Sequence, residues 1–251
     1  MKLLCLIPAY NEKGNLRQLI RKLTFVLKKT FIEYKILLII QGTDGSLSLV
    51  KELKKTHKEI YFLYFPKPLG IGSAYKIGFE NIGKDITHIL TMDADLNHDP
   101  EKIYQFLQVL KTYKADIIIG SRFMRNGQFR DKRIWKRILS FITNLFITKL
   151  FKIEVHDISS GYRLIKKKVI KALCKELIET GYPSYMEFII KAKRHGFTIK
   201  ELPITYMPRK WGESKMNKFK TTFDYFFFFT KMLFFAKNPY QRHTINRFCK
   251  H

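Results

Sequence analysis

The segment Met92-Asp93-Ala94-Asp95-Leu96-Asn97-His98-Asp99-Pro100 ends an apolar run at residues 86–92 and is the most informative stretch of the chain. The run predicts a buried strand. Asp93 and Asp95 are separated by one residue, so extended backbone points both carboxylates to the same side. Converging carboxylates repel each other unless a cation joins them, and hard oxygen ligands suit Mg²⁺ or Mn²⁺. We therefore predict a divalent-metal site at Asp93 and Asp95, to which Asn97 can add a third oxygen. The alternative is a plain loop whose Asp99 starts the following helix.

Strands and helices are predicted to alternate on both sides of this segment. Apolar runs predict strands at residues 3–7, 36–40, 60–65, 86–92, 117–119 and 197–202. Helical periodicity predicts helices at residues 16–27, 47–56, 74–81, 103–110, 137–151, 167–178 and 184–195. This order is typical of an α/β fold with a mostly parallel sheet covered by helices on both faces. Ligands of such sheets bind beyond the carboxyl ends of the strands, where residues 8–12, 41–46 and 93–99 are expected.

The composition indicates a folded, strongly basic chain. Hydrophobic residues make up 46% of the 251 positions, which supports a packed core and argues against a disordered protein. The formal net charge of +26 attracts polyanions, namely nucleic acid, anionic lipid or phosphorylated substrates. Cys5, Cys174 and Cys249 have neither metal-ligand spacing nor a disulfide framework, which fits a reducing compartment. No apolar stretch reaches the roughly 20 residues that span a bilayer, and the first apolar run is too short for a signal peptide.

Six motifs occur in the order in which one enzyme family carries them. They are Ile7-Pro8-Ala9-Tyr10-Asn11-Glu12, Gly70-Ile71-Gly72-Ser73-Ala74-Tyr75, the acidic segment at 93–100, Gly120-Ser121-Arg122, Asp157-Ile158-Ser159-Ser160-Gly161-Tyr162-Arg163 and Arg209-Lys210-Trp211-Gly212-Glu213-Ser214-Lys215. Over roughly residues 3–216 the chain resembles the family 2 glycosyltransferases, closest to the dolichyl-phosphate mannose synthase group. The resemblance implies a GT-A fold with a Rossmann-like sheet. It also implies a nucleotide-sugar donor whose diphosphate is held by a metal ion on Asp93, Asp95 and Asn97.

The resemblance further implies where the donor binds. Its base and ribose are expected at Pro8, Ala9, Tyr10 and Glu12, with further donor contacts at Gln41, Gly70, Gly72, Asp93 and Ala94. Arg209 and Lys215 belong to a loop that closes over the diphosphate in the family, and Arg209 is expected to act in catalysis with Asp95 and Arg122. Without the resemblance, Asn11 is interpreted as an ordinary helix cap, and Gly70 and Gly72 are equally well explained as loop glycines.

The chain departs from the family pattern at the end of the second predicted strand. The family carries a pair of aspartates followed by Gly-Ser, whereas this chain has Gln41-Gly42-Thr43-Asp44-Gly45-Ser46. An amide both donates and accepts hydrogen bonds where a carboxylate only accepts, so Gln41 reads a base edge differently. The departure leaves GDP and UDP open as the donor nucleotide. Asp44 either takes over the role or forms a plain Asp-Gly turn.

A basic segment at residues 122–137 follows the strand beside the predicted metal site. Such a segment is usually a solvated charged loop, but Arg also binds phosphate through two parallel hydrogen bonds. The resemblance implies that Arg122, Lys136 or Arg137, and Ser140 bind the phosphate of a polyprenyl (dolichyl or undecaprenyl) phosphate acceptor. A phosphate monoester, with a second pKa near about 6, is already an anionic nucleophile. A site for it needs positive charge rather than a strong base.

Three alternatives to this acceptor stay open. Transfer onto a sugar hydroxyl in glycan or cell-wall synthesis needs a general base, for which Asp157 is the candidate. A basic nucleic-acid-binding protein accounts for the charge but leaves the acidic pair unexplained. A degenerate, non-catalytic relative is suggested by the departure at Gln41. Glu187, on a predicted helix, is expected to be structural.

The end of the chain is rich in aromatic residues. We expect a catalytic domain at residues 1–216 and a C-terminal region at 217–251, in which residues 219–235 form an aromatic helix that is apolar on all sides. Such a helix is either buried or in contact with lipid, and its flanking bases suit a peripheral position on the cytoplasmic face of a membrane. Docking onto its own domain or onto a membrane-protein partner is the alternative.

The sequence therefore predicts an inverting, metal-dependent hexosyltransferase. A mannose- or glucose-type sugar passes in a single displacement from a nucleotide-sugar to a polyprenyl phosphate at a membrane surface. No nucleic-acid partner is predicted.

Overall fold

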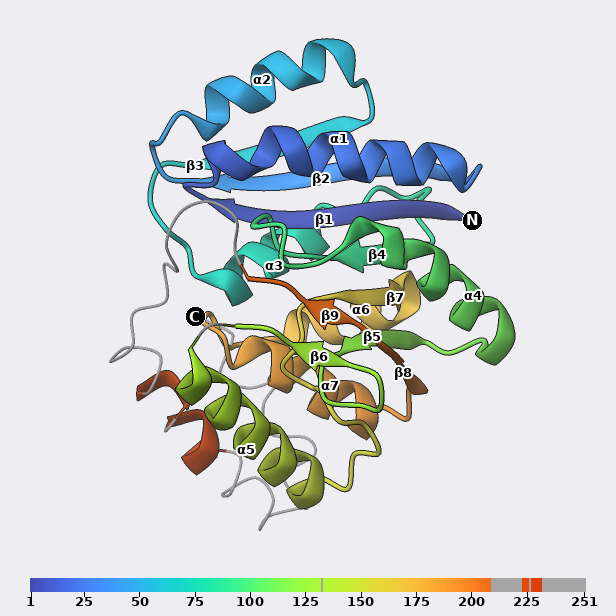
Figure 1. Ribbon diagram of the computed structural model, residues 1–251, viewed down its shortest axis with the longest axis vertical. Helices are drawn as coiled ribbons and strands as arrows, with labels where there is room; N and C mark the ends of the chain where they lie inside the picture. Colours follow the sequence, from blue (N-terminus) through green and yellow to red (C-terminus); the bar gives the residue numbers. More distant parts are fainter. Residues whose placement is uncertain (132, 209–222, 226, 232–251) are drawn as a thin grey trace.

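A seven-stranded sheet forms the centre of the molecule in the computed structural model, which describes residues 1–131, 133–208, 223–225 and 227–231, without the side chain of Lys136 (Figure 1). The strand order is β3-β2-β1-β4-β7-β5-β8. The strands are β1 (Lys2–Tyr10), β2 (Glu33–Gln41), β3 (Ile60–Phe65), β4 (His88–Thr91), β5 (Ile117–Ser121), β7 (Arg163–Lys166) and β8 (Ile199–Pro203). All neighbours pair in parallel except β7, which runs antiparallel to β4 and β5. The predicted mostly parallel α/β fold is therefore confirmed.

Helices cover both faces of this sheet. They are α1 (Lys13–Lys29), α2 (Ser46–Thr56), α3 (Ile71–Glu80), η1 (Pro100–Lys102), α4 (Ile103–Tyr113), α5 (Ile134–Leu150), α6 (Lys167–Leu173), η2 (Cys174–Glu176) and α7 (Ser184–Arg194). On one face, Leu16 of α1, Val50 of α2 and Phe106 of α4 share a core. On the other, Phe79 of α3 and Phe188 of α7 belong to a second core. Side chains of β1 and β2 alternate between these two cores, which explains why both strands are apolar at nearly every central position.

The second half of the chain contains one strand that was not predicted and one helix that is shorter than predicted. The sequence pattern does not predict β7, because only Leu164 and Ile165 stand between two charged residues, too few to show a period. The helix predicted at 167–178 is too long, since α6 ends at Leu173 and the short η2 turn follows. Beyond η2, the carboxylate of Glu187 accepts the backbone N–H groups of residues 178 and 179. The structural role expected of Glu187 is confirmed by these hydrogen bonds.

A small second sheet includes part of the basic segment. Strand β6 (Gln128–Phe129) pairs in parallel with β9 (Thr205–Tyr206), and the N–H of Arg130 donates to the carbonyl of Tyr206 at 3.0 Å. Just after β9, the N–H of Met207 donates to the carbonyl of Asn97 at 3.2 Å. The basic segment is thus partly ordered by backbone pairing. The second sheet brings it beside the acidic segment at the carboxyl ends of the central strands.

The described part of the C-terminal region is helical. Residues 223–225 and 227–231 form helix, and Phe228 is fully buried in the second core. The remainder of the aromatic helix expected at 219–235 lies outside the described residues. Among the described helices, none has both the length and the apolar character that a bilayer crossing requires.

Candidate active site

The acidic loop, residues 93–99, follows β4 and is held by its own side chains. The N–H of Asn97 donates to Asp95 Oδ1 at 3.1 Å, and Asn97 Nδ2 donates to Asp95 Oδ2 at 2.6 Å. Asn97 Nδ2 also lies 2.5 Å from the hydroxyl of Tyr206 in β9. Asp95 is buried, whereas the side chain of Asp93 keeps 27% of its exposure. The two carboxylates are therefore placed at the carboxyl end of the sheet, with one of them open to solvent.

Asp99 starts the next helix and takes no part in this network. Its carboxylate accepts the N–H of Glu101 at 3.1 Å, which caps the η1 turn that begins at Pro100. The helix-starting role that the sequence offers for Asp99 is thereby confirmed. Asp93 and Asp95 do not share this helix-starting role.

His98, for which the sequence pattern predicts no role, supports the acidic loop through its ring and its Nδ1. Its buried ring stacks on Tyr162, with ring centroids 4.9 Å apart, and its Nδ1 accepts the backbone N–H of Asp93 at 3.1 Å. Burial lowers the pKa of His98 to about 4, against the opposing charge of Asp95. The ring is therefore neutral near pH 7, and its 3.8 Å approach to the carboxylate of Asp93 is not an ion pair. The sequence signal for this supporting role of His98 is its position inside an acidic motif.

The acidic loop offers oxygen ligands that fit a divalent cation. Among the described residues, no group of three or more His, Cys, Asp and Glu side chains is arranged to hold a metal. The donors here are two carboxylates and one amide, and Asn97 Oδ1 is buried without a hydrogen-bond partner. A buried oxygen without a partner is costly unless something occupies it. Mg²⁺ keeps several waters and takes phosphate oxygens, so it needs few protein ligands. Asp93, Asp95 and Asn97 are therefore the residues that would hold such an ion.

The end of β1 and the start of α1 form a neighbouring wall. Ala9 is buried and Tyr10 is half-buried, while Glu12 is buried with its carboxylate accepting from Asn15 Nδ2 at 2.6 Å. The expectation that Asn11 caps the helix is wrong. Asn11 has a φ of 51°, and its Oδ1 accepts the N–H of Thr43 at 3.1 Å, which ties the loop after β2 to the end of β1.

Gln41 ends β2 and is almost completely buried. Its Oε1 accepts the N–H of Leu69 at 2.8 Å, which anchors the loop before α3. The adjacent Asp44 accepts the N–H of Lys13 and of Ser46, both at 2.9 Å. Asp44 therefore serves the starts of α1 and α2, and the turn explanation for it is confirmed. A carboxylate oxygen at this position could accept the same hydrogen bond from the N–H of Leu69.

Gly70 and Gly72 allow close contact between the α3 loop and the segment before α7. The N–H of Gly72 donates to the carbonyl of Thr180 at 2.8 Å. A Cβ on Gly72 would lie 2.2 Å from the carbonyl oxygen of Glu179, and one on Gly70 would lie 2.5 Å from that of Thr180. Gly70 also has a φ of 85°, which favours glycine. Packing within the protein is thus sufficient to explain both glycines.

Arg122, at the end of β5, is paired with Asp157. Its Nε and Nη2 donate to the two carboxylate oxygens at 2.7 and 2.8 Å, and Nη2 also donates to Ser159 Oγ at 2.7 Å. The guanidinium lies over the ring of Phe129, 4.4 Å from its centroid. Burial alone would raise the pKa of Asp157, but the charge and hydrogen bonds of Arg122 lower it. Asp157 is fully buried, both of its carboxylate oxygens accept from Arg122, and its pKa is lowered, so it is a poor proton acceptor for a hydroxyl.

The remaining predicted acceptor residues lie on or near α5. Ser140 is half-buried, with its Oγ 3.3 Å from Ser159 Oγ, whereas Arg137 is exposed. Ser140 is therefore connected to Arg122 through Ser159. The side chain of Lys136 and the whole of Arg209 and Lys215 lie outside the described residues.

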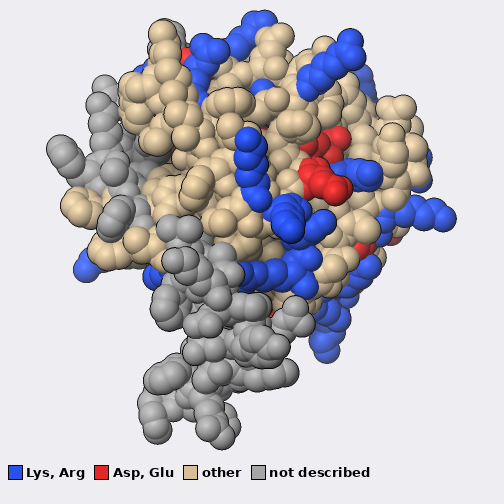
Figure 2. All heavy atoms as spheres, turned by 90° about the horizontal axis from the view of Figure 1, so that it is seen from below, with Lys and Arg blue, Asp and Glu red and all other residues tan. Residues whose placement is uncertain are grey.

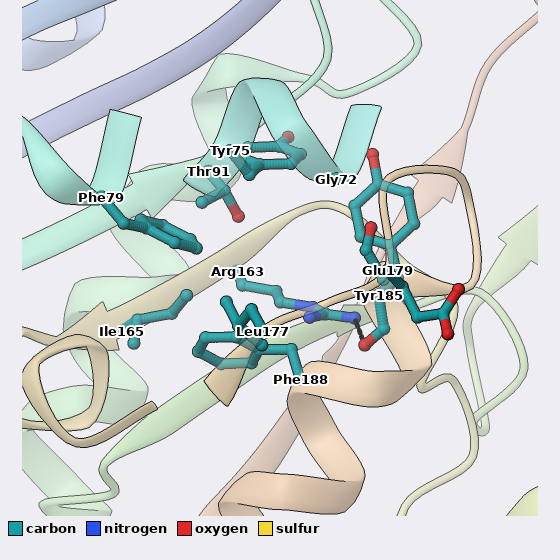
Figure 3. A pocket seen from close by; sticks show the side chains of 11 residues that line it. Gly72, Tyr75, Phe79, Thr91, Arg163, Ile165, Leu177, Glu179, Tyr185 and Phe188 are labelled. Atoms are coloured by element: carbon teal, nitrogen blue, oxygen red, sulfur yellow. Dashed lines mark hydrogen bonds between the residues drawn. The ribbon is translucent and has the colours of Figure 1, made fainter. Parts of the chain in front are cut away.

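A pocket opens behind the acidic loop, between α3, β4, β7 and α7 (Figure 3). Tyr75, Phe79 and Phe188 line it together with Arg163, whose guanidinium donates to the carbonyl of Tyr185 at 2.8 Å. The hydroxyl of Tyr185 lies 3.4 Å from Asp93 Oδ1. Burial lowers the pKa of Arg163 to about 10, so it remains charged near pH 7. The mostly apolar lining of the pocket thus supports Tyr185, which contacts Asp93, and the sequence pattern does not predict this pocket.

The comparisons with known proteins agree on one family. The model of the family described as "Glycosyl transferase family 2" matches residues 5–174. The polyprenol monophosphomannose synthase of Mycolicibacterium smegmatis is 30% identical over 219 residues, covering 85% of this chain and 80% of the relative. The undecaprenyl-phosphate mannosyltransferase of Micrococcus luteus is 28% identical over 220 residues, covering 86% and 88%.

The solved structures show the same fold at low sequence identity. The glucosyl-3-phosphoglycerate synthase of Mycobacterium tuberculosis, solved with Mn²⁺, UDP and glucosyl-3-phosphoglycerate, is 13% identical with a TM-score of 0.64. The aligned region covers 95% of this chain and 79% of the synthase. The same protein with Mg²⁺ and UDP gives a TM-score of 0.62 at 14% identity, covering 95% and 78%.

Proposed function

The chain belongs to the family 2 glycosyltransferases and has the GT-A fold, and we propose that its reaction is hexosyl transfer to a polyprenyl phosphate. The donor is a nucleotide-sugar, the sugar is of the mannose or glucose type, and the transfer inverts the anomeric centre. One observation carries this proposal: the guanidinium of Arg122, oriented by its ion pair with Asp157, lies near the acidic loop. The guanidinium carbon of Arg122 is 5.6 Å from the ring centroid of Tyr206, whose hydroxyl contacts Asn97. The names of the two curated relatives, both of which specify a polyprenol-type acceptor, support it.

The acidic loop is proposed to hold Mg²⁺ or Mn²⁺ at Asp93, Asp95 and Asn97. When bound there, the ion acts as a Lewis acid for the diphosphate of the donor. The donor is proposed to lie along the ends of β1 and β2, against Pro8, Ala9, Tyr10, Glu12 and Gln41, with Gly70, Gly72 and Ala94 close by. Arg209 and Lys215 are proposed to neutralise the diphosphate. The solved relative with Mn²⁺ and UDP supports a metal and a nucleotide in this fold.

The acceptor phosphate is proposed to bind between Arg122, Ser140 and the bases at the start of α5, Lys136 and Arg137. Nε and Nη2 of Arg122 already donate to Asp157 and Ser159, so Nη1 of Arg122 and the hydroxyl of Ser140 are the donors that the site offers a phosphate. A phosphate monoester attacks as an anion and needs no proton acceptor. Asp157 is fully buried and its lowered pKa makes it a weak base, which supports this acceptor over a sugar hydroxyl, because a hydroxyl requires a base.

The location proposed for the enzyme is peripheral, on the cytoplasmic face of a membrane. A polyprenyl phosphate resides in a bilayer, and a chain of net charge +26 is attracted to anionic headgroups. Nucleic acid is not proposed as a partner, because the acidic loop serves no purpose in binding it. A membrane-protein partner for the C-terminal region is part of this proposal.

A direct assay tests the function. The full chain, with Mn²⁺ or Mg²⁺, is incubated with radiolabelled GDP- and UDP-hexoses and with either undecaprenyl phosphate or its dephosphorylated alcohol. We expect label to enter the organic phase only with the phosphate, as an acid-labile product. Equal transfer to the free alcohol, or transfer to water-soluble glycans alone, would overturn the proposal. Tight duplex-DNA binding that falls with salt, without transfer, would favour a nucleic-acid-binding role.

A further inference from the structure

Tyr206, the last residue of β9, lies where the acidic loop and the basic segment meet. Its hydroxyl is 2.5 Å from Asn97 Nδ2, and the next residue, Met207, donates its backbone N–H to the carbonyl of Asn97 at 3.2 Å. The side chain of Tyr206 is buried. The sequence pattern predicts no role for Tyr206, because 109 positions separate it from Asn97 along the chain.

Aromatic contacts hold the ring of Tyr206 in place. The ring meets that of Phe129 edge to face, with centroids 5.0 Å apart, and that of His98 edge to face at 5.7 Å. The carbonyl of Tyr206 accepts the N–H of Arg130 at 3.0 Å, so backbone pairing fixes the residue as well. A buried ring that is packed in this way has little freedom to turn. Its hydroxyl is therefore a fixed point beside Asn97.

The hydroxyl of Tyr206 completes the hydrogen bonding of the Asn97 amide nitrogen. An amide NH₂ group carries two donors, whereas an ionised carboxylate only accepts. Nδ2 of Asn97 donates to Asp95 Oδ2 at 2.6 Å and to the hydroxyl of Tyr206 at 2.5 Å, which uses both donors. Within the described part of the chain, Oδ1 of Asn97 is left buried without a partner. This oxygen is therefore the atom that Asn97 presents to a cation.

The ring of Tyr206 also contacts the arginine of the proposed acceptor site. The guanidinium carbon of Arg122 lies 5.6 Å from the ring centroid of Tyr206 and 4.4 Å from that of Phe129. A guanidinium within about 6 Å of an aromatic centroid is attracted by the electron-rich face of the ring. One tyrosine thus contacts the predicted third metal ligand through its hydroxyl and the predicted acceptor-binding arginine through its ring.

We infer that Tyr206 is a positioning residue, whose hydroxyl holds Asn97 as an oxygen ligand of the metal site and whose ring holds the guanidinium of Arg122. This inference rests on the proposed function, because it requires a cation at the acidic loop and an acceptor at Arg122. A cation at Asp95 attracts the same carboxylate that accepts from Asn97, which weakens that hydrogen bond. The hydroxyl of Tyr206 is not among the proposed ligands, so it keeps the amide in place when the site is loaded.

Two substitutions separate the hydroxyl from the ring. Tyr206→Phe removes only the hydroxyl, and Tyr206→Leu removes the ring as well. In paramagnetic Mn²⁺ titrations of the full chain with GDP, and in parallel with UDP, both variants should bind Mn²⁺ about three- to tenfold more weakly. KM for undecaprenyl phosphate should stay constant in Tyr206→Phe and rise about two- to fivefold in Tyr206→Leu. Tyr34→Phe is the matched control, because the hydroxyl of Tyr34 contacts Glu59 at 3.4 Å, near the start of β2.

A double-mutant cycle tests whether the hydroxyl acts through Asn97. In Asn97→Asp a carboxylate presents an oxygen whichever way it is turned, so adding Tyr206→Phe should lower Mn²⁺ affinity by less than about twofold. None of the substitutions at Tyr206 changes a charge. The many Lys and Arg side chains that Figure 2 shows on the molecule seen from below therefore attract a nucleoside diphosphate equally in the wild type and in these variants.

Two outcomes would overturn the role of the hydroxyl. The first is Mn²⁺ affinity in Tyr206→Phe equal to that of the wild type. The second is the same loss of affinity from Tyr206→Phe in the Asn97→Asp background, because the hydroxyl would then not act through Asn97. An unchanged acceptor KM in Tyr206→Leu would overturn the role of the ring. If Tyr206→Leu does not fold, Tyr206→Met, which also lacks a ring but fills irregular space better, takes its place.

Failure of the proposed function gives a different result. A wild type that binds no Mn²⁺ with either nucleotide removes the metal site, and the inference is overturned together with it. A wild type that binds Mn²⁺ but transfers no sugar to undecaprenyl phosphate removes the proposed acceptor and with it the role of the ring. The titrations and the double-mutant cycle then decide the role of the hydroxyl by themselves.

Discussion

The Nε of Arg122 lies 2.7 Å from Oδ2 of Asp157, and this buried ion pair joins two motifs that are 35 residues apart in the chain. The pair places a guanidinium beside the acidic loop and fixes its direction. It also occupies the carboxylate that the sequence offers as a general base and lowers the pKa of that group, which makes it a weaker base. The arrangement therefore favours an acceptor that is itself an anion.

Asp157→Asn is expected to destabilise the fold. Removing one partner of a buried ion pair leaves an uncompensated charge and typically costs about 3–5 kcal/mol. Urea unfolding at pH 7 measures the loss. The matched control is Asp85→Asn, which removes an exposed partner of Lys2 and Lys35 and should cost much less. If both variants lose the same free energy of unfolding, the buried Arg122–Asp157 pair stabilises the fold no more than the exposed ion pairs of Asp85.

Asp157→Asn should also change how the free energy of unfolding depends on pH. The pKa of Asp157 is lowered in the folded protein, so the pair contributes fully above the ordinary carboxyl pKa of about 4. That contribution is lost as the pH falls through the lower, folded-state pKa. Between pH 7 and acid, the wild type should therefore lose more stability than Asp157→Asn. Parallel curves for the two proteins below about pH 4 would contradict this.

Asp95→Asn should abolish transfer and leave the fold intact. An amide is a poorer ligand than a carboxylate for a hard cation. Paramagnetic Mn²⁺ titration in the presence of nucleoside diphosphate gives a readout that does not depend on turnover, and affinity should fall at least about tenfold. Asp99→Asn is the matched control, because Asp99 only caps η1. Full activity in Asp95→Asn, or undiminished turnover in excess chelator, would exclude the metal site.

Arg122→Lys should weaken use of the acceptor more than use of the donor. Lysine keeps the charge but loses the planar fork that grips Asp157 and offers further donors to a phosphate. We expect KM for polyprenyl phosphate to rise about tenfold, equivalent to about 1.4 kcal/mol, with little change in nucleotide affinity. Arg125→Lys, an exposed change in the same segment, is the control. If nucleotide affinity collapses while the acceptor KM stays constant, Arg122 serves the donor instead.

Gln41→Glu should change the nucleotide preference. Glutamate keeps the length of the side chain and an oxygen for the N–H of Leu69, but it loses the amide donor. Thermal shifts with GDP, UDP, CDP and dTDP in Mn²⁺ rank the nucleotides, because a ligand stabilises by RT ln(1 + [L]/Kd). We expect the ranking to differ between the two proteins. An unchanged ranking would restrict Gln41 to anchoring the α3 loop.

Much of the fold follows from local patterns. Six of the seven strands in the central sheet, and the alternation with helices, follow from apolar runs and helical periods that lie within single segments. The cap at Asp99 and the turn at Asp44 are equally local, because Glu101 and Ser46 lie only two residues further along the chain. The acidic pair was predicted because the spacing of Asp93 and Asp95 by itself points both carboxylates to the same side. The donor, acceptor and metal assignments remain predictions.

Relations between distant residues were decided only by tertiary structure. The sequence determined that β4 ends in a carboxylate pair and that the chain is strongly basic and rich in apolar residues. It could not determine that β7 enters the sheet antiparallel, that His98 supports Asp93, or that Asp157 grips Arg122. It also could not determine that Phe228 is core or that Tyr206 meets Asn97. The physical reason is that pairing, burial and pKa depend on what packs against a residue. An apolar helix has the same sequence pattern whether it faces the protein core or a lipid surface.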